Sequence, residues 1–110
     1  MVSLVGGFVC MMRKKYYQGR LCESNVSYEF FCHPPLKLNL NNLGNQLADE
    51  GVLFDIKTAF VLVFHLEGVR VSLYPSGRLL FKNLNVEKDA KRLFQKLLNI
   101  LENCPAFADE

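Results

Sequence analysis

Residues 59–82 read AFVLVFHLEGVRVSLYPSGRLLFK, and this stretch decides the fold. Apolar side chains alternate with others on both sides of Glu67 and Gly68, a two-residue connection typical of a tight β-hairpin. The sequence Pro-Ser-Gly at 75–77 predicts a second turn, because proline presets an early backbone angle and glycine closes such turns. The stretch therefore predicts three consecutive antiparallel strands, at 59–66, 69–74 and 78–82.

A long amphipathic helix is expected next. Asn85 is the expected N-cap, Glu87 lies in the first turn, where the helix dipole favours anions, and Pro105 ends the pattern. Apolar residues recur at helical spacing and form one stripe: Val86, Ala90, Leu93, Phe94, Leu97, Ile100, Leu101 and Cys104.

Upstream of residue 59 the signals are shorter. Two runs between Tyr16 and Cys32 flank a turn-prone cluster at 23–25, which predicts an opening hairpin or a lone strand over 26–32. His33-Pro34-Pro35 stops that strand. A short helix with Leu40, Leu43 and Leu47 on one face follows, with Asn39 as cap and Gly51 as terminator, and then a brief strand at 52–56.

These elements give the order strand, helix, four strands, helix. We expect an α+β fold, with a curved antiparallel sheet of about five strands and both helices on one face. The chain has 110 residues, half of them apolar, enough for one domain. The expected boundaries are an N-terminal extension at 1–20, the domain at 21–104 and a loose tail at 105–110.

Charge and cysteine content exclude several classes of protein. The formal net charge is +2, which predicts no strong affinity for nucleic acid or membranes unless the charges are unevenly placed. The apolar run at 1–12 is too short to span a bilayer, and its basic residues follow it, the reverse of an export signal. Four cysteines without a CxxC spacing indicate reduced thiols in a cytoplasmic protein.

The sequence contains no familiar pattern of catalytic or metal-binding residues. A set of Cys22, Cys32 and His33 is the one metal alternative, and its spacing matches no familiar ligand pair. His65 has no acid or thiol within sequence reach that would make it a general base. We therefore expect a noncatalytic protein without cofactor or metal.

Alternation sorts the strands at 59–82 into two faces. The first is wholly apolar and is expected to meet the long helix: Phe60, Leu62, Phe64, Leu66, Val69, Val71, Leu73, Leu79 and Phe81. The second face mixes small apolar groups with cations and a tyrosine. None of the residues of 59–82 assigned to this face is an acid. Its members are Ala59, Val61, Val63, His65, Arg70, Ser72, Tyr74, Arg78, Leu80 and Lys82. Such a face is too apolar for comfortable exposure and too basic for a core, so we expect something to cover it.

The stretch VSLYPSGRLL at 71–80, followed by VEKDAKR at 86–92, resembles one repeat of the TATA-box-binding protein family, over roughly 26–101. The resemblance implies a curved sheet whose concave face lies in the minor groove of DNA. Tyr74 stands where the family has a kinking phenylalanine, Ser76 and Arg78 match the turn serine and its basic phosphate partner, and His65 matches a basic position. The sequence departs from the family at Ala59, too small for a second kinking residue, and at Lys82, where a threonine is usual.

The family has two repeats in one chain, whereas this chain has one, so the resemblance implies a homodimer with a continuous sheet. Single halves of this fold also resemble the accessory domain of some ribonucleases H, which grips hybrid duplexes. The first expectation is thus a nucleic-acid-binding module, with phosphates held by Arg70, Arg78 and Lys82 and sugars or bases touched by Val61, Val63, Tyr74 and Leu80. The alternatives are a protein-interaction or dimerisation module and, third, a small-ligand pocket between sheet and helix.

Overall fold

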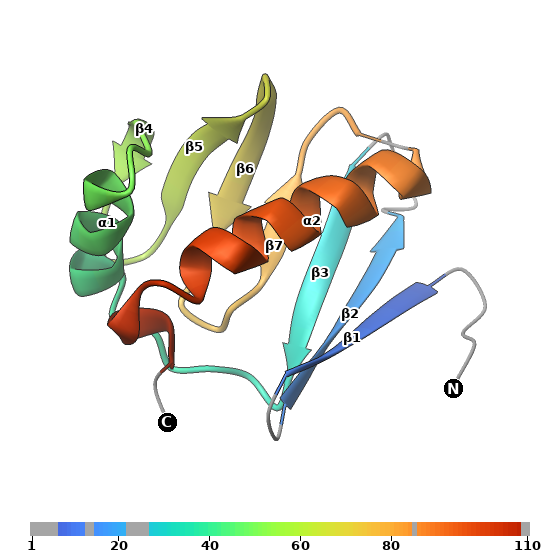
Figure 1. The fold of residues 1–110 in the computed structure, drawn as a ribbon, viewed down its shortest axis with the longest axis horizontal. Helices are drawn as coiled ribbons and strands as arrows, with labels where there is room; N and C mark the ends of the chain where they lie inside the picture. Colours follow the sequence, from blue (N-terminus) through green and yellow to red (C-terminus); the bar gives the residue numbers. More distant parts are fainter. Residues whose placement is uncertain (1–6, 13–14, 22–26, 85, 109–110) are drawn as a thin grey trace.

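The computed structural model describes residues 7–12, 15–21, 27–84 and 86–108 (Figure 1). The strands are β1 (Gly7–Met12), β2 (Lys15–Leu21), β3 (Tyr28–His33), β4 (Phe54–Lys57), β5 (Leu62–Leu66), β6 (Val69–Leu73) and β7 (Leu79–Phe81). The helices are α1 (Leu40–Asp49), α2 (Glu87–Leu101) and a short 3-10 helix, η1 (Pro105–Ala108).

One open antiparallel sheet contains every described strand, in the order β1-β2-β3-β7-β6-β5-β4. Helix α1 carries the chain from β3 to the far edge, and β4 to β7 then meander back until β7 pairs with β3. The expected α+β class and the order from β3 to α2 are confirmed. The expected number of about five strands is too low, because β1 and β2 add to the sheet beside β3.

The predicted turns form where the sequence places them. Glu67 and Gly68 both have positive φ, 51° and 82°, as a tight two-residue hairpin requires. Gly77 has a φ of 92° and donates its N–H to the carbonyl of Tyr74 at 2.9 Å.

Strand β5 begins three residues later than expected, and this corrects the predicted position of Phe60. The Thr58 hydroxyl oxygen accepts the N–H groups of Phe60 and Val61, each at 3.1 Å, and so folds these residues into a turn. Phe60 therefore does not lie on the core face and is 80% exposed. The remaining members of that face are buried or half-buried in the core.

The helix ends follow the sequence at three of four positions. Asn39 caps α1 by accepting the Asn42 N–H at 3.1 Å, and Gly51, with a φ of 94°, follows its end. Helix α2 stops at Leu101, before Pro105. Its N-cap is Val86, without a side-chain cap, so the prediction of Asn85 as the cap is wrong; Asn85 itself lies outside the described residues.

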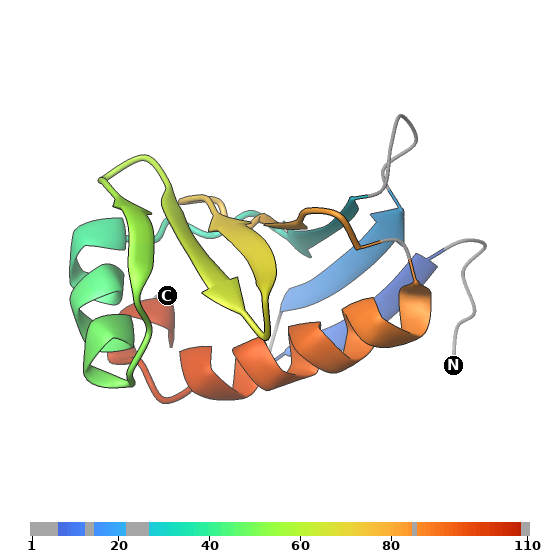
Figure 2. The same cartoon turned by 90° about the horizontal axis from the view of Figure 1, so that it is seen from above.

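Both helices pack on the same face of the sheet (Figure 2). Phe94 of α2 stacks on Phe30 of β3 with ring centroids 4.3 Å apart, at the centre of the core. The end of the chain joins this core: Phe107 of η1 is buried, and the Ala106 N–H donates to the side-chain oxygen of Gln46 at 2.8 Å. Residues 105–108 are thus packed instead of forming part of a loose tail.

Strand β2 is built into the same core. The Tyr17 side chain is fully buried, and its hydroxyl donates to the carbonyl of Gly77 at 2.6 Å. Gly19 lies opposite Phe30, and a Cβ at Gly19 would meet the Phe30 ring at 2.5 Å, so glycine leaves the room that this ring fills. None of the described helices is long and apolar enough to cross a membrane.

Candidate functional site

The candidate site is the sheet face opposite α2, called here the open face (Figure 2). A central row of side chains crosses it because strand pairing aligns one residue from each of six strands. In order from β4 to β2 this row is Ile56, Val63, Ser72, Leu80, Glu29 and Arg20. Val63, Ser72 and Glu29 are buried although none of the described helices covers them, so their neighbours on the face shield them from water.

A second row runs along one side of the central row and carries positive charge. His65 pairs with Arg70, and the Lys82 N–H bonds the Arg70 carbonyl at 2.9 Å, which places Lys82 beside Arg70. His65 lies 3.1 Å from the carboxylate of Asp55, measured from Nδ1 to Oδ2. All four residues are exposed, so the row is accessible to a ligand.

A third row, on the opposite side, holds a guanidinium between aromatic rings. The guanidinium carbon of Arg78 lies 4.9 Å from the centroid of Tyr74 and 5.8 Å from that of Phe31. Arg20 also lies over the Phe31 ring, at 5.0 Å. These cation–π contacts favour fixed positions for both guanidinium groups.

Glu29 joins the two arginines on the open face. Its Oε2 accepts a hydrogen bond from Arg78, and its Oε1 lies 3.6 Å from Nε of Arg20. The Glu29 side chain is only 10% exposed, whereas Arg78 is 34% and Arg20 64% exposed. A carboxylate so deeply covered depends on such partners, because burying an unpaired charge is costly.

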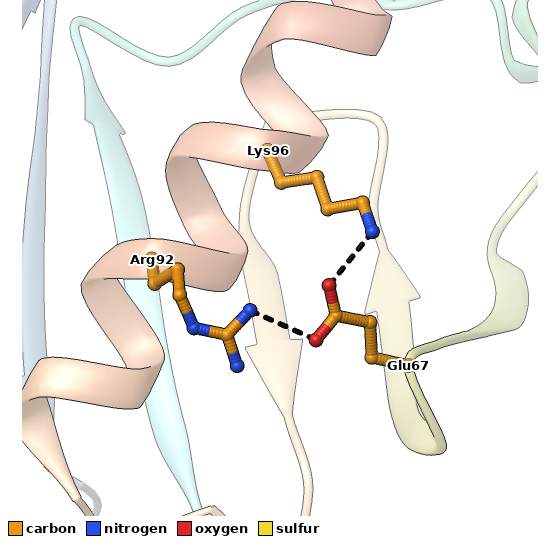
Figure 3. A network of polar contacts seen from close by, with 3 residues as sticks. All are labelled: Glu67, Arg92 and Lys96. Atoms are coloured by element: carbon orange, nitrogen blue, oxygen red, sulfur yellow. Dashed lines mark hydrogen bonds and ion pairs between the residues drawn. The ribbon is translucent and has the colours of Figure 1, made fainter.

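The hairpin that carries His65 and Arg70 is fixed to α2 by a polar network (Figure 3). The two carboxylate oxygens of Glu67 accept from Arg92 at 2.8 Å and from Lys96 at 2.7 Å. The bonds from Lys96 and Arg92 lower the pKa of Glu67 below its ordinary value. The network therefore holds the β5–β6 turn against the helix while the strands present their other face.

The structure brings most of the predicted residues together on the open face. His65, Arg70 and Lys82 form its exposed basic side, and Tyr74, Arg78 and Leu80 lie half-buried beside Glu29. Four predicted residues are less available as contacts. Val63 and Ser72 are buried, Val61 belongs to the Thr58 turn, and Ser76 sits in the loop before β7, where its carbonyl accepts the Leu36 N–H at 2.8 Å.

Sequence reasoning missed the carboxylates of this face. Glu29 and Asp55 lie on it. The open face therefore has no acid from 59–82, as expected, but it does have acids from other strands of the sheet. Alternation along 26–32 could have placed Glu29 and Phe31 on one side of their strand. The missing information was that β3 pairs with β7.

The described members of the metal alternative, Cys32 and His33, lie on opposite sides of β3. Cys32 is buried in the core, while its neighbour His33 contacts the ring of Tyr16 at a centroid distance of 5.1 Å on the other side of the strand. Cys22 lies outside the described residues. Among the residues that the structure describes, no three His, Cys, Asp or Glu side chains lie close enough to hold a metal ion.

Comparison with known proteins adds no assignment: no protein-family model, no curated protein and no solved structure matches this chain.

Proposed function

We propose that this chain is a noncatalytic module that binds nucleic-acid duplexes, DNA or RNA–DNA hybrid, on the open face. The observation that carries the proposal is the charge of that face. Among the described residues it holds four cations, Arg20, Arg70, Arg78 and Lys82, against the carboxylates of Glu29 and Asp55. The positive excess is gathered on the one side of the sheet that no described helix covers, and such placement attracts a polyanion despite a modest net charge.

The order of elements from β3 to α2 also supports the proposal, because it agrees with the order in a TATA-box-binding protein repeat. Exposed Arg70 and Lys82 would contact phosphates, while Tyr74 and Leu80 would touch sugars or bases. A minor groove accepts apolar, aromatic and basic side chains together.

The test is duplex binding across a salt series. Fluorescence anisotropy with 20-base-pair DNA, RNA and hybrid duplexes, at about 25 to 200 mM salt, gives the slope of log Kd against log salt. Lys82→Gln should reduce that slope by about 0.9, the value of one phosphate contact. Lys88→Gln is the matched control, because it removes the same charge from an exposed lysine on α2. Absence of binding by every duplex at the lowest salt, or equal loss in the two variants, would reject the proposal.

We also propose that the binding form is a homodimer joined through β1. In the part of the sheet that the structure describes, the edge strands are β1 and β4. Strand β4 is short, its pairing is interrupted by a register shift between Phe54 and Ile56, and it carries Asp55 and Lys57, features that oppose strand addition. The sequence of β1, GFVCMM, has no charge and no proline.

Light scattering over a hundredfold range of protein concentration tests the dimer. Val9→Lys places a charge in β1 and should yield the monomer, whereas Lys57→Gln at the other edge should leave the mass unchanged. A wild-type chain that stays monomeric throughout would contradict the dimer while leaving duplex binding open.

Docking of another protein is the second candidate function. Leu53 and Phe60 flank β4 and are 87% and 80% exposed, unusual for such large apolar side chains. If this surface is the functional one, Phe60→Ser abolishes partner capture while Lys82→Gln leaves it intact.

A further inference from the structure

We infer that Glu29 is an internal competitor for phosphate, which holds Arg20 and Arg78 in a paired state that a bound duplex must open. The inference rests on the proposed function and concerns regulation of the same surface. Its basis is that one carboxylate is paired with two cations of the open face at once.

The cations on the two sides of the open face differ in how readily they can bind a phosphate. Within the described ranges no carboxylate is paired with Arg70 or Lys82, and both side chains are exposed. Arg78, in contrast, donates to Glu29 while Tyr74 and Phe31 flank its guanidinium group. A phosphate reaching Arg78 would therefore share or replace the donors that Glu29 now uses.

The pairing is costly to open because of where Glu29 lies. Its side chain is nine-tenths covered, so loss of an arginine would leave a poorly hydrated carboxylate. Arg70 and Lys82 would consequently provide the first contacts with any polyanion. Arg20 and Arg78 would bind phosphates only when a well-fitted duplex makes enough contacts to offset the cost of breaking their pairs with Glu29. The arrangement lowers affinity for nonspecific polyanions more than affinity for a fitted duplex.

Replacing Glu29 by glutamine tests the inference, because the amide keeps the shape and loses the charge. We expect Glu29→Gln to bind duplexes more tightly than the wild type. The slope of log Kd against log salt should steepen by about 0.9 to 1.8, one or two additional phosphate contacts.

Asp55→Asn is the matched control. It removes the same charge from the same face, but its partner is His65 instead of an arginine. If the effect of Glu29 were only one of net charge, the two variants would show the same slope, and that result would overturn the inference. Should Glu29→Gln fail to fold, Glu29→Asp, which withdraws the carboxylate by one methylene, should shift the slope in the same direction.

A second readout separates the inference from the proposed function. Inorganic pyrophosphate can be titrated against the guanidinium NMR signals of Arg20 and Arg78. If no duplex binds but pyrophosphate perturbs these signals more strongly in Glu29→Gln than in Asp55→Asn, the competition is supported and the duplex proposal is rejected. Equal perturbation in both variants, with or without duplex binding, rejects the competition.

Discussion

The hydroxyl of Tyr17 offers the sharpest test of how the N-terminal strands are integrated. Tyr17→Phe removes one oxygen atom from a fully buried side chain and with it the 2.6 Å hydrogen bond to the carbonyl of Gly77. The ring itself remains and keeps its edge contact with Phe94, at a centroid distance of 5.1 Å. The change therefore isolates one polar contact between residues 60 positions apart.

The expected cost follows from what the mutation leaves behind. A buried carbonyl that loses its partner costs about 1–3 kcal/mol. At about 4 °C per kcal/mol for a chain of this size, the melting temperature should fall by about 4–12 °C. Urea unfolding followed by circular dichroism measures the cost directly. The midpoint should fall while the m-value stays constant, because the surface exposed on unfolding is unchanged.

Tyr16→Phe is the matched control, since Tyr16 is the adjacent residue, is 37% exposed and points to the other side of β2. That variant should change the unfolding free energy by less than about 0.5 kcal/mol. Equal stability of Tyr17→Phe and the wild type would refute the idea that β2 is anchored by this bond.

The loss of stability at alkaline pH provides a second test of Tyr17. Burial raises the pKa of Tyr17 far above its ordinary value of 10.0. Above pH 10 the unfolded chain loses the Tyr17 proton while the folded chain keeps it, so stability is complete below pH 10 and declines above it. The decline contributed by one such group is about 1.4 kcal/mol per pH unit. Tyr17→Phe should show a correspondingly shallower loss of stability above pH 10.

Three further substitutions test the core and the polar network. Gly19→Ala should destabilise the fold by about 1–3 kcal/mol in urea unfolding, because the new methyl group meets the Phe30 ring; a neutral result would contradict the close approach. Phe60→Ser should change the unfolding free energy by no more than about 0.5 kcal/mol, whereas a core phenylalanine would cost several times more. Glu67→Gln should lower stability at neutral pH. The lowered pKa of Glu67 means that its contribution is present above the ordinary glutamate pKa and is lost as pH falls through the folded value, so wild type and variant should converge in acid. A constant difference across this pH range would show that the Lys96 and Arg92 contacts do not depend on charge.

Much of the fold could be predicted because local signals agree with packing between 59 and 101. The Glu67-Gly68 turn sets the register of β5 and β6, and alternation then determines which side chains enter the core. The exception, Phe60, shows the limit of alternation. A single side-chain cap by Thr58 ends the extended pattern, and periodicity alone carries no sign of it.

Only part of the candidate site could be predicted from the sequence. Arg70 of β6 and the cations on either side of β7, Arg78 and Lys82, lie in one continuous stretch with a clear turn in it, so their common face could be predicted. Glu29, Phe31 and Arg20 come from strands far earlier in the chain, and their position depends on the long-range pairing of β3 with β7. Nonlocal pairing of this kind leaves no periodic signal in either segment.

Strand β2 contributes both to the core and to the open face. On one side it contributes Tyr17, whose hydroxyl holds the carbonyl of Gly77 immediately before Arg78. On the other side it contributes Arg20, which shares Glu29 with that same Arg78. A segment expected to be an extension thus fixes both the backbone that presents Arg78 and the carboxylate that restrains it. Disturbing the packing of β2 would displace the paired arginines of the open face as well as the core, so stability and binding should be measured together for every variant in 15–21.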